Sequence, residues 1–139
     1  MSVDALPTLL SVMTPFPYTA PADVSMSEAS TRFEEHAIRH LPLVRGERIV
    51  GLLRRDVLEV ALEHAGAGHP ALAVSRQNPL VVDQGARLED VLARLAEDAG
   101  DAALVVRHGK LVGIVTSTDI CQGFAELLGL RDDDDPDVA

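Results

Sequence analysis

The stretch "GIVTSTDI", from Gly113 to Ile120, decides the fold because the chain holds a second version of it, "GLLRRDVL", from Gly51 to Leu58. Both versions begin with a glycine, continue through apolar residues and reach an aspartate that an apolar residue follows. The downstream version has five residues between the glycine and the aspartate, and the upstream version has four. We interpret the difference as a deletion of one residue between Leu53 and Asp56 in a duplicated unit.

The duplication extends well beyond these two stretches. Displacing the sequence by 62 positions aligns residues 12–53 with residues 74–115 without a gap, and from Asp56 onward we expect a displacement of 63. The identical pairs include Pro17 with Pro79, Arg32 with Arg94, Glu35 with Glu97 and Gly51 with Gly113. The chain is therefore predicted to contain two copies of one unit.

Each copy predicts the order strand, helix, strand, strand, helix. Two apolar runs in each copy are separated by "RGER" or "RHGK", which predicts a hairpin of two strands. Helices are predicted after the hairpins, from about Asp56 to Ala65 and from about Thr116 to Leu128. The helix before the second hairpin is predicted from apolar residues at spacings of three and four, namely Leu88, Val91, Leu92, Leu95 and Ala96.

This order places the chain in the α+β class (mixed α/β), as two βαββα repeats. A unit of about 60 residues covers the apolar face of its sheet poorly, so we expect the repeats to pack sheet to sheet with pseudo-two-fold symmetry. The first repeat is predicted to span residues 1–66, including an N-terminal helix, and the second to span residues 67–130. Residues 131–139 are predicted to be a disordered acidic tail.

The composition argues against several classes of partner and site. Twelve basic residues against 22 acidic ones give a net charge of −10, so the basic face that nucleic acids require is missing. No apolar run approaches the roughly 18 residues of a membrane span, and the first residues lack the basic start of a signal peptide. We therefore expect a cytoplasmic protein. One cysteine and five scattered histidines predict neither a disulfide nor a metal site.

Four motifs, in this order and largely in duplicate, resemble the tandem cystathionine-beta-synthase (CBS) domain pair, also called a Bateman module. They are "VMTP" at residues 12–15, "HLPLV" at 40–44, "GKLVGIV" at 109–115 and "TSTD" at 116–119. The resemblance covers about residues 10–129. It implies a regulatory sensor that binds an adenosyl-containing ligand such as AMP, ATP or S-adenosylmethionine in a cleft between the repeats.

The resemblance also implies which residues contact the ligand. Thr116 and Thr118 would approach its phosphate or ribose, and Asp119 would accept hydrogen bonds from the ribose hydroxyls, because a carboxylate offers two acceptor oxygens to a cis-diol. The base would be sandwiched by Tyr18 or Thr19 and by Ile38, Arg39 and His40. Independently of the resemblance, a helix that begins near Thr116 presents unpaired amides, which suit a phosphate or another oxygen-rich group.

The same residues also fit a reading without a ligand. Thr116 and Asp119 are spaced as a variant capping box, and Asp56 fits a plain helix cap. A deletion before Asp56 would turn the following helix by about 100° relative to the strand, and the hydroxyl residue is absent there. We therefore predict that the pocket of the first copy is degenerate and that the second copy carries the competent one.

Taken together, we expect a stand-alone ligand-sensing CBS pair that is not an enzyme and needs no metal or resident cofactor. The nucleophile, zinc and phosphate-loop motifs of common enzymes are missing. The alternative is a structural or interaction module with decayed pockets and no ligand. We expect a homodimer and an unidentified protein partner. Candidates for the dimer face are Leu58, Leu62, Phe124 and Leu127 or Leu128.

Overall fold

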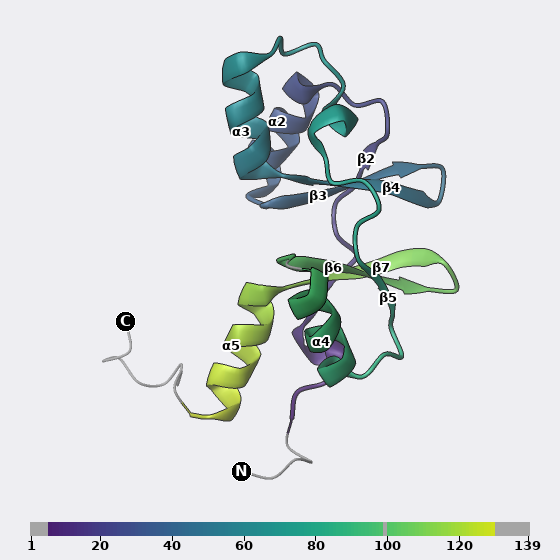
Figure 1. Cartoon of the computed structure of the whole chain (residues 1–139), viewed down its shortest axis with the longest axis vertical. Coiled ribbons are helices and arrows are strands. Elements are labelled where there is room, and N and C mark those ends of the chain that lie inside the picture. The colour runs from purple at the N-terminus through teal and green to yellow at the C-terminus, as the bar shows by residue number, and fades with distance from the viewer. Residues whose placement is uncertain (1–5, 99, 130–139) are drawn as a thin grey trace. The chain divides into compact units, whose positions relative to one another are not determined.

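The structure, a computed structural model, describes residues 6–98 and 100–129. Within them the predicted order of strand, helix, strand, strand, helix occurs twice, so the mixed α/β fold with two sheets is confirmed (Figure 1). The helices and strands lie close to their predicted positions. The predicted acidic tail, residues 131–139, lies outside the described residues.

The chain divides into two compact units. We call them the first-repeat unit, made of Pro17–Pro79 with Gly109–Leu111, and the second-repeat unit, whose described residues are 6–16, 80–98, 100–108 and 112–129. The predicted boundary at residues 66 and 67 concerns the sequence duplication and stays a prediction. The compact units divide elsewhere, because residues 6–16 belong to the second-repeat unit.

The first-repeat unit has a three-stranded sheet in the order β2-β3-β4, with α2 and α3 on one face (Figure 1). β2 pairs in parallel with β3, and β3 pairs antiparallel with β4 from His40–Arg54 to Arg45–Arg48. Ser25 caps α2 by accepting a hydrogen bond of 3.1 Å from the Glu28 amide. The elements are β2 (Ala20–Pro21), α2 (Met26–His36), β3 (His40–Arg45), β4 (Arg48–Arg54), α3 (Arg55–His64) and the 3-10 helix η2 (Ala71–Val74).

The second-repeat unit has a four-stranded sheet in the order β1-β7-β6-β5. β5 pairs in parallel with β6, as β2 does with β3 in the other unit. Three of the predicted apolar positions on α4, Leu88, Val91 and Leu95, are buried, whereas Ala96 is exposed. The elements are α1 (Leu9–Val12), β1 (Thr14–Pro15), β5 (Val81–Asp83), α4 (Leu88–Asp98), β6 (Ala102–Arg107), β7 (Lys110–Thr116) and α5 (Ser117–Leu127).

The segment before the first strand of each repeat packs on the sheet of the other repeat. β1 pairs antiparallel with β7, through Thr14 with Ile114 and Pro15 with Gly113, and α1 contacts α5. The matching segment before β5 belongs to the first-repeat unit, where η2 contacts β4 and α3 and Arg76 bridges to Leu52. Each unit therefore contains a segment from the other half of the duplicated sequence.

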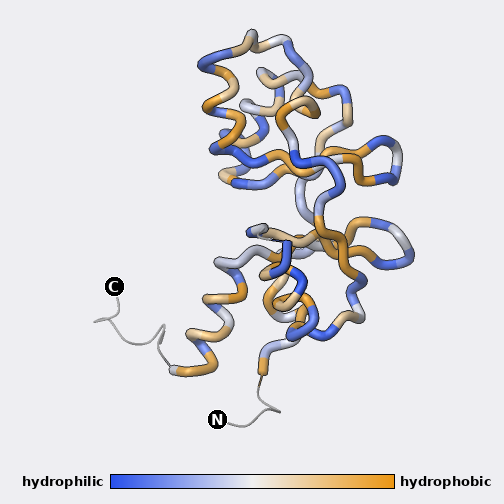
Figure 2. Tube along the Cα trace, viewed as in Figure 1, coloured by the Kyte–Doolittle hydropathy of each residue, from blue (hydrophilic) through white to orange (hydrophobic). Residues whose placement is uncertain are grey.

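Aliphatic side chains make up most of both cores, together with Met26 and Phe33 in the first-repeat unit. Figure 2 shows hydrophobic residues along the strands and hydrophilic ones at the turn between β3 and β4. The buried residues form one cluster in each unit, with Leu41, Leu43 and Leu53 in the first-repeat unit and Val105 and Val115 in the second. These cores fix the strands, whose carboxyl ends lead directly into α3 and α5.

Burial corrects one candidate for the dimer face. The side chain of Leu58 is only 1% exposed and belongs to the core of the first-repeat unit, because it is on the face of α3 that covers the sheet. Leu62 and Phe124 also pack against the cores of their units, whereas Leu128 is 51% exposed. In the described part of the chain, no helix combines the length and the apolar character that crossing a membrane requires.

Candidate functional site

The junction between β7 and α5 carries three hydroxyl residues and a carboxylate, at Thr116, Ser117, Thr118 and Asp119. Thr116 is the last residue of β7 and has an extended backbone, and α5 begins at the next residue. A β-branched residue fits the end of a strand, and its hydroxyl is a good acceptor at the start of a helix. Thr116 can therefore end the strand and cap the helix.

Thr116 and Asp119 form the predicted capping box. The Asp119 amide donates to Thr116 Oγ1 over 3.1 Å, and the Thr116 amide donates to Asp119 Oδ2 over 3.0 Å. Both side chains are half-buried, and Thr118, in the first turn of α5, is exposed. Among the described residues Asp119 Oδ1 accepts no hydrogen bond. One carboxylate oxygen and the Thr116 hydroxyl proton thus stay available at a fixed position.

The amides at this helix start are mostly used inside the chain. Besides the two amides of the capping box, the Ser117 amide donates to the Asp101 carbonyl over 2.8 Å, and the Ser117 hydroxyl approaches the same carbonyl at 3.4 Å. A phosphate at a helix N-terminus binds to free amides. The junction is therefore better suited to a neutral hydroxyl group than to a phosphate.

The corresponding junction in the first-repeat unit corrects the predicted deletion. The Arg55 amide donates to the Arg39 carbonyl over 2.9 Å, as Ser117 does to Asp101, so the displacement of 62 continues into the helix. The same displacement of 62 relates Leu58 to Ile120, and both residues are buried. Both strands have seven residues. No residue is missing, and the expected rotation of α3 by about 100° is wrong, because both helices must bury the same apolar position.

This register places different residues at the matched positions. Arg54 corresponds to Thr116, and Val57 corresponds to Asp119, while Asp56 corresponds to Thr118. Arg54 precedes α3 without any side-chain cap. The first-repeat unit thus lacks both partners of the capping box at this junction.

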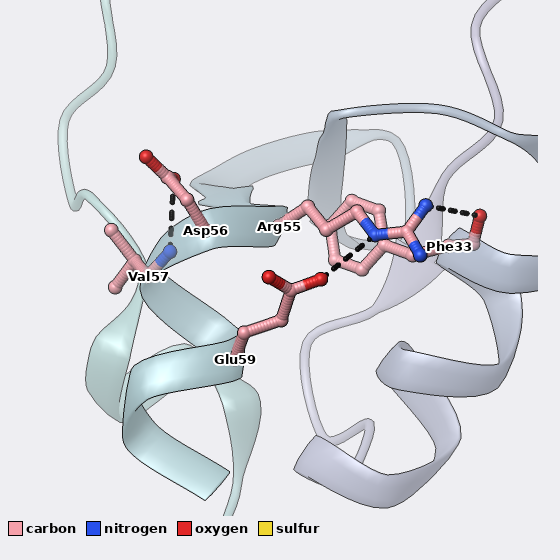
Figure 3. Close-up of polar contacts among 5 residues, drawn as sticks. All are labelled: Phe33, Arg55, Asp56, Val57 and Glu59. Atoms are coloured by element: carbon pink, nitrogen blue, oxygen red, sulfur yellow. Dashed lines mark hydrogen bonds and ion pairs between the residues drawn. The ribbon is translucent and has the colours of Figure 1, made fainter. Parts of the chain in front are cut away.

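Asp56 uses both carboxylate oxygens within its own helix turn. Oδ1 accepts from the Val57 amide over 2.9 Å, and Oδ2 lies 2.6 Å from Nη2 of Arg54. Figure 3 shows that Arg55 turns the other way, toward Glu59 at 3.1 Å and the Phe33 carbonyl at 3.5 Å. Asp56 therefore accepts a hydrogen bond from a backbone amide at the start of α3, as a cap residue does. It is, however, the second residue of the helix and not the residue before it.

Tyr18 and Thr19 lie beside the end of α2 in the first-repeat unit. The ring of Tyr18 stacks on the ring of His36, with 3.7 Å between centroids and 11° between planes. The Thr19 carbonyl accepts a hydrogen bond of 3.0 Å from Nη1 of Arg32, which lies one turn before His36 on α2. Tyr18 is 53% exposed and Thr19 is half-buried.

Ile38, Arg39 and His40 form the link from α2 to β3. Ile38 packs against the core of the first-repeat unit, and Arg39 is exposed while its carbonyl accepts the Arg55 amide. His40 is the first residue of β3 and pairs with Arg54 of β4. The structure thus gathers five of the predicted residues in the first-repeat unit and the other three, Thr116, Thr118 and Asp119, in the second-repeat unit.

Sequence reasoning missed His36 as a partner of Tyr18. The two residues are 18 positions apart, so no short motif joins them, and they meet because the chain reverses between β2 and α2. A hollow of about 440 Å³ in the second-repeat unit is lined by residues 6–10 and 84–89 and contains none of the predicted site residues. Within residues 6–98 and 100–129, no three His, Cys, Asp or Glu residues are grouped to hold a metal ion.

Comparisons with known proteins agree with the duplication. The CBS domain family matches residues 9–63 and 72–126. An uncharacterized protein of Methanocaldococcus jannaschii is 29% identical over 113 residues, which cover 80% of this chain. The chain spans only 39% of the length of that relative.

Two solved structures have the same fold. One is a CBS domain pair in complex with 5′-methylthioadenosine and S-adenosyl-L-methionine, with a TM-score of 0.77 and 24% identity over 87% of this chain and 98% of that one. The other is the CBS domain of a bacterial CNNM/CorC family Mg²⁺ transporter in complex with ATP, with a TM-score of 0.73 and 20% identity over 88% of this chain and 87% of that one.

Proposed function

This chain belongs to the CBS domain family as a tandem pair of CBS domains, and we propose that it is a regulatory protein that binds an adenosyl-containing small molecule. Two proteins of the same fold bind ligands of this class, namely S-adenosyl-L-methionine with 5′-methylthioadenosine, and ATP. The proposed activity is recognition without catalysis, and the ligand is a reversible signal rather than a resident cofactor.

The observation that carries the proposal is the capping box at the start of α5. It orients the Asp119 carboxylate through one oxygen, Oδ2, and leaves Oδ1 as an acceptor. One oxygen with two lone pairs can accept from both hydroxyls of a ribose cis-diol, and the Thr116 hydroxyl can donate to a ribose oxygen. Thr118, exposed in the same turn, is the third proposed contact. A ribose therefore meets groups whose geometry is already fixed.

The remaining proposed contacts are to the base of the ligand. Tyr18, Thr19, Ile38, Arg39 and His40 are proposed to contact the base, as the family resemblance implies. Because the amides of Thr116, Ser117 and Asp119 are already paired, the turn offers little to a phosphate. We therefore place adenosine, 5′-methylthioadenosine and S-adenosylmethionine ahead of AMP and ATP.

Thermal unfolding with a panel of these five compounds tests the proposal. A ligand at 100 times its Kd should raise the free energy of unfolding by about 2.7 kcal/mol. Asp119→Ala should remove this stabilisation, whereas Asp56→Ala, which changes the exposed aspartate of the other junction, should keep it. A panel in which no compound changes the melting temperature contradicts the proposal.

The alternative function is a structural or interaction module without a ligand. The completeness of the capping box favours it, because Thr116 and Asp119 both have a structural role without any ligand. In that case Asp119→Ala would lower stability and change nothing else. The same panel separates the two functions, since only the sensor responds to adenosyl compounds.

Self-association is a further part of the proposal. Exposed apolar side chains lie on the helices of both units, with Val60 of α3 57% exposed and Leu128, just after α5, 51% exposed. Such residues are suited to a homodimer face, and a protein partner is the alternative occupant. Sedimentation velocity of the wild type and of a Val60→Lys variant would detect a dimer that depends on α3, and a strictly monomeric wild type would contradict it.

A further inference from the structure

Phe16, which follows β1 in the second-repeat unit, combines high exposure with an unfavourable backbone conformation. Its side chain is 79% exposed, and its φ of 47° lies in the left-handed region, which bulky residues seldom adopt. The Phe16 amide donates to the Val112 carbonyl over 2.9 Å, so the pairing of this segment with β7 holds the backbone in place. The sheet therefore uses the turn at Phe16 but does not bury the ring.

The other repeat shows which residue the turn favours. Asn78 stands at the position of Phe16, displaced by 62, and has a φ of 54°. Each of the two comes two positions after a residue that bridges to a strand, Thr14 in one unit and Arg76 in the other, and each precedes a proline. Asparagine adopts the left-handed conformation more readily than other residues except glycine. A phenylalanine thus stands where the fold favours an asparagine, which indicates a role outside folding.

The hollow of about 440 Å³ in the same unit is large enough for an aromatic ring. A cavity of roughly 150 Å³ is sufficient to bind benzene. Nε of Arg87 and Oε1 of Glu89, which both line the hollow, lie 3.1 Å apart, so their charges are paired with each other and the hollow suits an uncharged occupant. Its apolar lining residues are Leu6, Pro7, Leu9, Leu10, Ala86 and Leu88.

We propose that this chain forms a two-fold homodimer in which Phe16 of each copy inserts into the hollow of the other copy. The inference rests on the self-association part of the proposed function and places the dimer face on the second-repeat unit. Because the ring and the hollow belong to the same unit, one two-fold axis makes both contacts at once. Leu10, at the hollow, is six residues from Phe16, so at most about 20 Å separates them. A dimer patch of about 800 Å² per copy can include both.

The area of the two contacts favours a second copy as the occupant. A buried phenylalanine covers about 150–250 Å², so two reciprocal rings supply roughly a quarter of a standard interface of about 1,600 Å². A single ring in an unrelated partner would supply half as much. Large side chains that fill pockets near the centre of an interface also contribute most of the binding energy. Phe16 and the hollow therefore form a self-complementary pair.

Sedimentation equilibrium of the full chain measures the dissociation constant of the dimer. Phe16→Asn should raise this constant more than about thirtyfold, because each copy loses a hot-spot residue. Leu10→Lys, which places a charge at the hollow, should raise it similarly. Ala93→Lys is the matched control and should leave it unchanged, because Ala93 is an exposed residue of α4 that does not line the hollow.

A mixture of two variants tests the reciprocal contact itself. In a heterodimer, the intact Phe16 of the Leu10→Lys copy meets the intact hollow of the Phe16→Asn copy, whereas neither variant alone can form a complete contact. The equimolar mixture should therefore associate at least about tenfold more tightly than either variant alone. At concentrations where monomers dominate, Phe16→Asn should melt no lower than the wild type, because the turn favours asparagine.

Equal dissociation constants of the wild type and Phe16→Asn, or a mixture that associates no more tightly than its components, overturn the inference. A lower melting temperature of monomeric Phe16→Asn also overturns it, because the ring would then stabilise its own chain. A dimer that Val60→Lys dissociates and Phe16→Asn does not overturns the inference while the proposed self-association stands. A strictly monomeric wild type overturns both, and the binding of adenosyl compounds is decided by its own panel.

Discussion

Leu58 of α3 and Ile120 of α5 lie 62 positions apart, and each is buried under the sheet of its own unit, at 1% and 5% exposure. This equivalence fixes the register of the two strand-to-helix junctions. It makes Arg54 the counterpart of Thr116 and Val57 the counterpart of Asp119. The two repeats therefore differ at this junction by substitution and not by length.

The first prediction follows from that register. The double substitution Arg54→Thr with Val57→Asp should build a capping box at the start of α3 and raise the free energy of unfolding by about 1 kcal/mol. Chemical denaturation measures the change. Inserting one threonine after Arg54 should instead destabilise the protein, because Leu58 would rotate out of the core; a stabilising insertion would restore the deletion hypothesis.

The second prediction concerns the existing capping box. Thr116→Val keeps the shape and the strand preference of the side chain but removes the acceptor for the Asp119 amide. We expect a loss of about 1 kcal/mol of stability, measured by urea unfolding. Thr118→Val, in the same turn but exposed and outside the box, should cost less. Equal losses of stability in Thr116→Val and Thr118→Val would show that the capping box does not stabilise α5.

The third prediction concerns the close packing of the N-terminal segment on β7. A Cβ atom at Gly113 would lie 2.5 Å from Met13 Sδ and 3.2 Å from the Thr14 carbonyl oxygen, and the carbonyl belongs to a strand that pairs with β7. Gly113→Ala should therefore cost about 1–3 kcal/mol of stability. Gly68→Ala is the control, since a Cβ there meets nothing within 4 Å. Similar melting temperatures of the two variants would contradict the packing.

The fourth prediction concerns the exchanged segments. A fragment of residues 17–79 keeps Ala71 of η2, which is fully buried in the core of the first-repeat unit, whereas a fragment of residues 1–66 lacks it. The fragment of residues 17–79 should therefore give more dispersed amide resonances and stronger protection from hydrogen exchange than the fragment of residues 1–66. Better order in the fragment 1–66 would mean that η2 does not complete this core.

Much of the fold could be predicted from the sequence because both copies carry the same pattern of apolar residues and turns, so each element is indicated twice. The hairpins and α4 lie where their patterns predict them. The exchange of α1 and η2 could not be predicted, because short segments of four residues leave no periodicity and their contacts are distant in sequence. The deletion predicted before Asp56 is wrong because it matches one aspartate, whereas the buried residues Leu58 and Ile120 keep the displacement of 62.

The candidate site was predictable only in part, for a similar reason. Thr116 and Asp119 form a local motif, and the structure places them in the capping box that their spacing predicts. The contact of Tyr18 with His36 depends on how α2 folds back beside β2, which no motif records. The ligand contacts themselves stay predictions.

Calorimetric titration with S-adenosylmethionine and with adenosine tests most directly whether the turn at the start of α5 binds a ribose. We expect one binding site per chain in the wild type and in Asp56→Ala, and none in Asp119→Ala, which should remain folded at a cost of about 1 kcal/mol from the lost cap. Unchanged binding by folded Asp119→Ala, or two equivalent sites per chain in the wild type, would contradict the account.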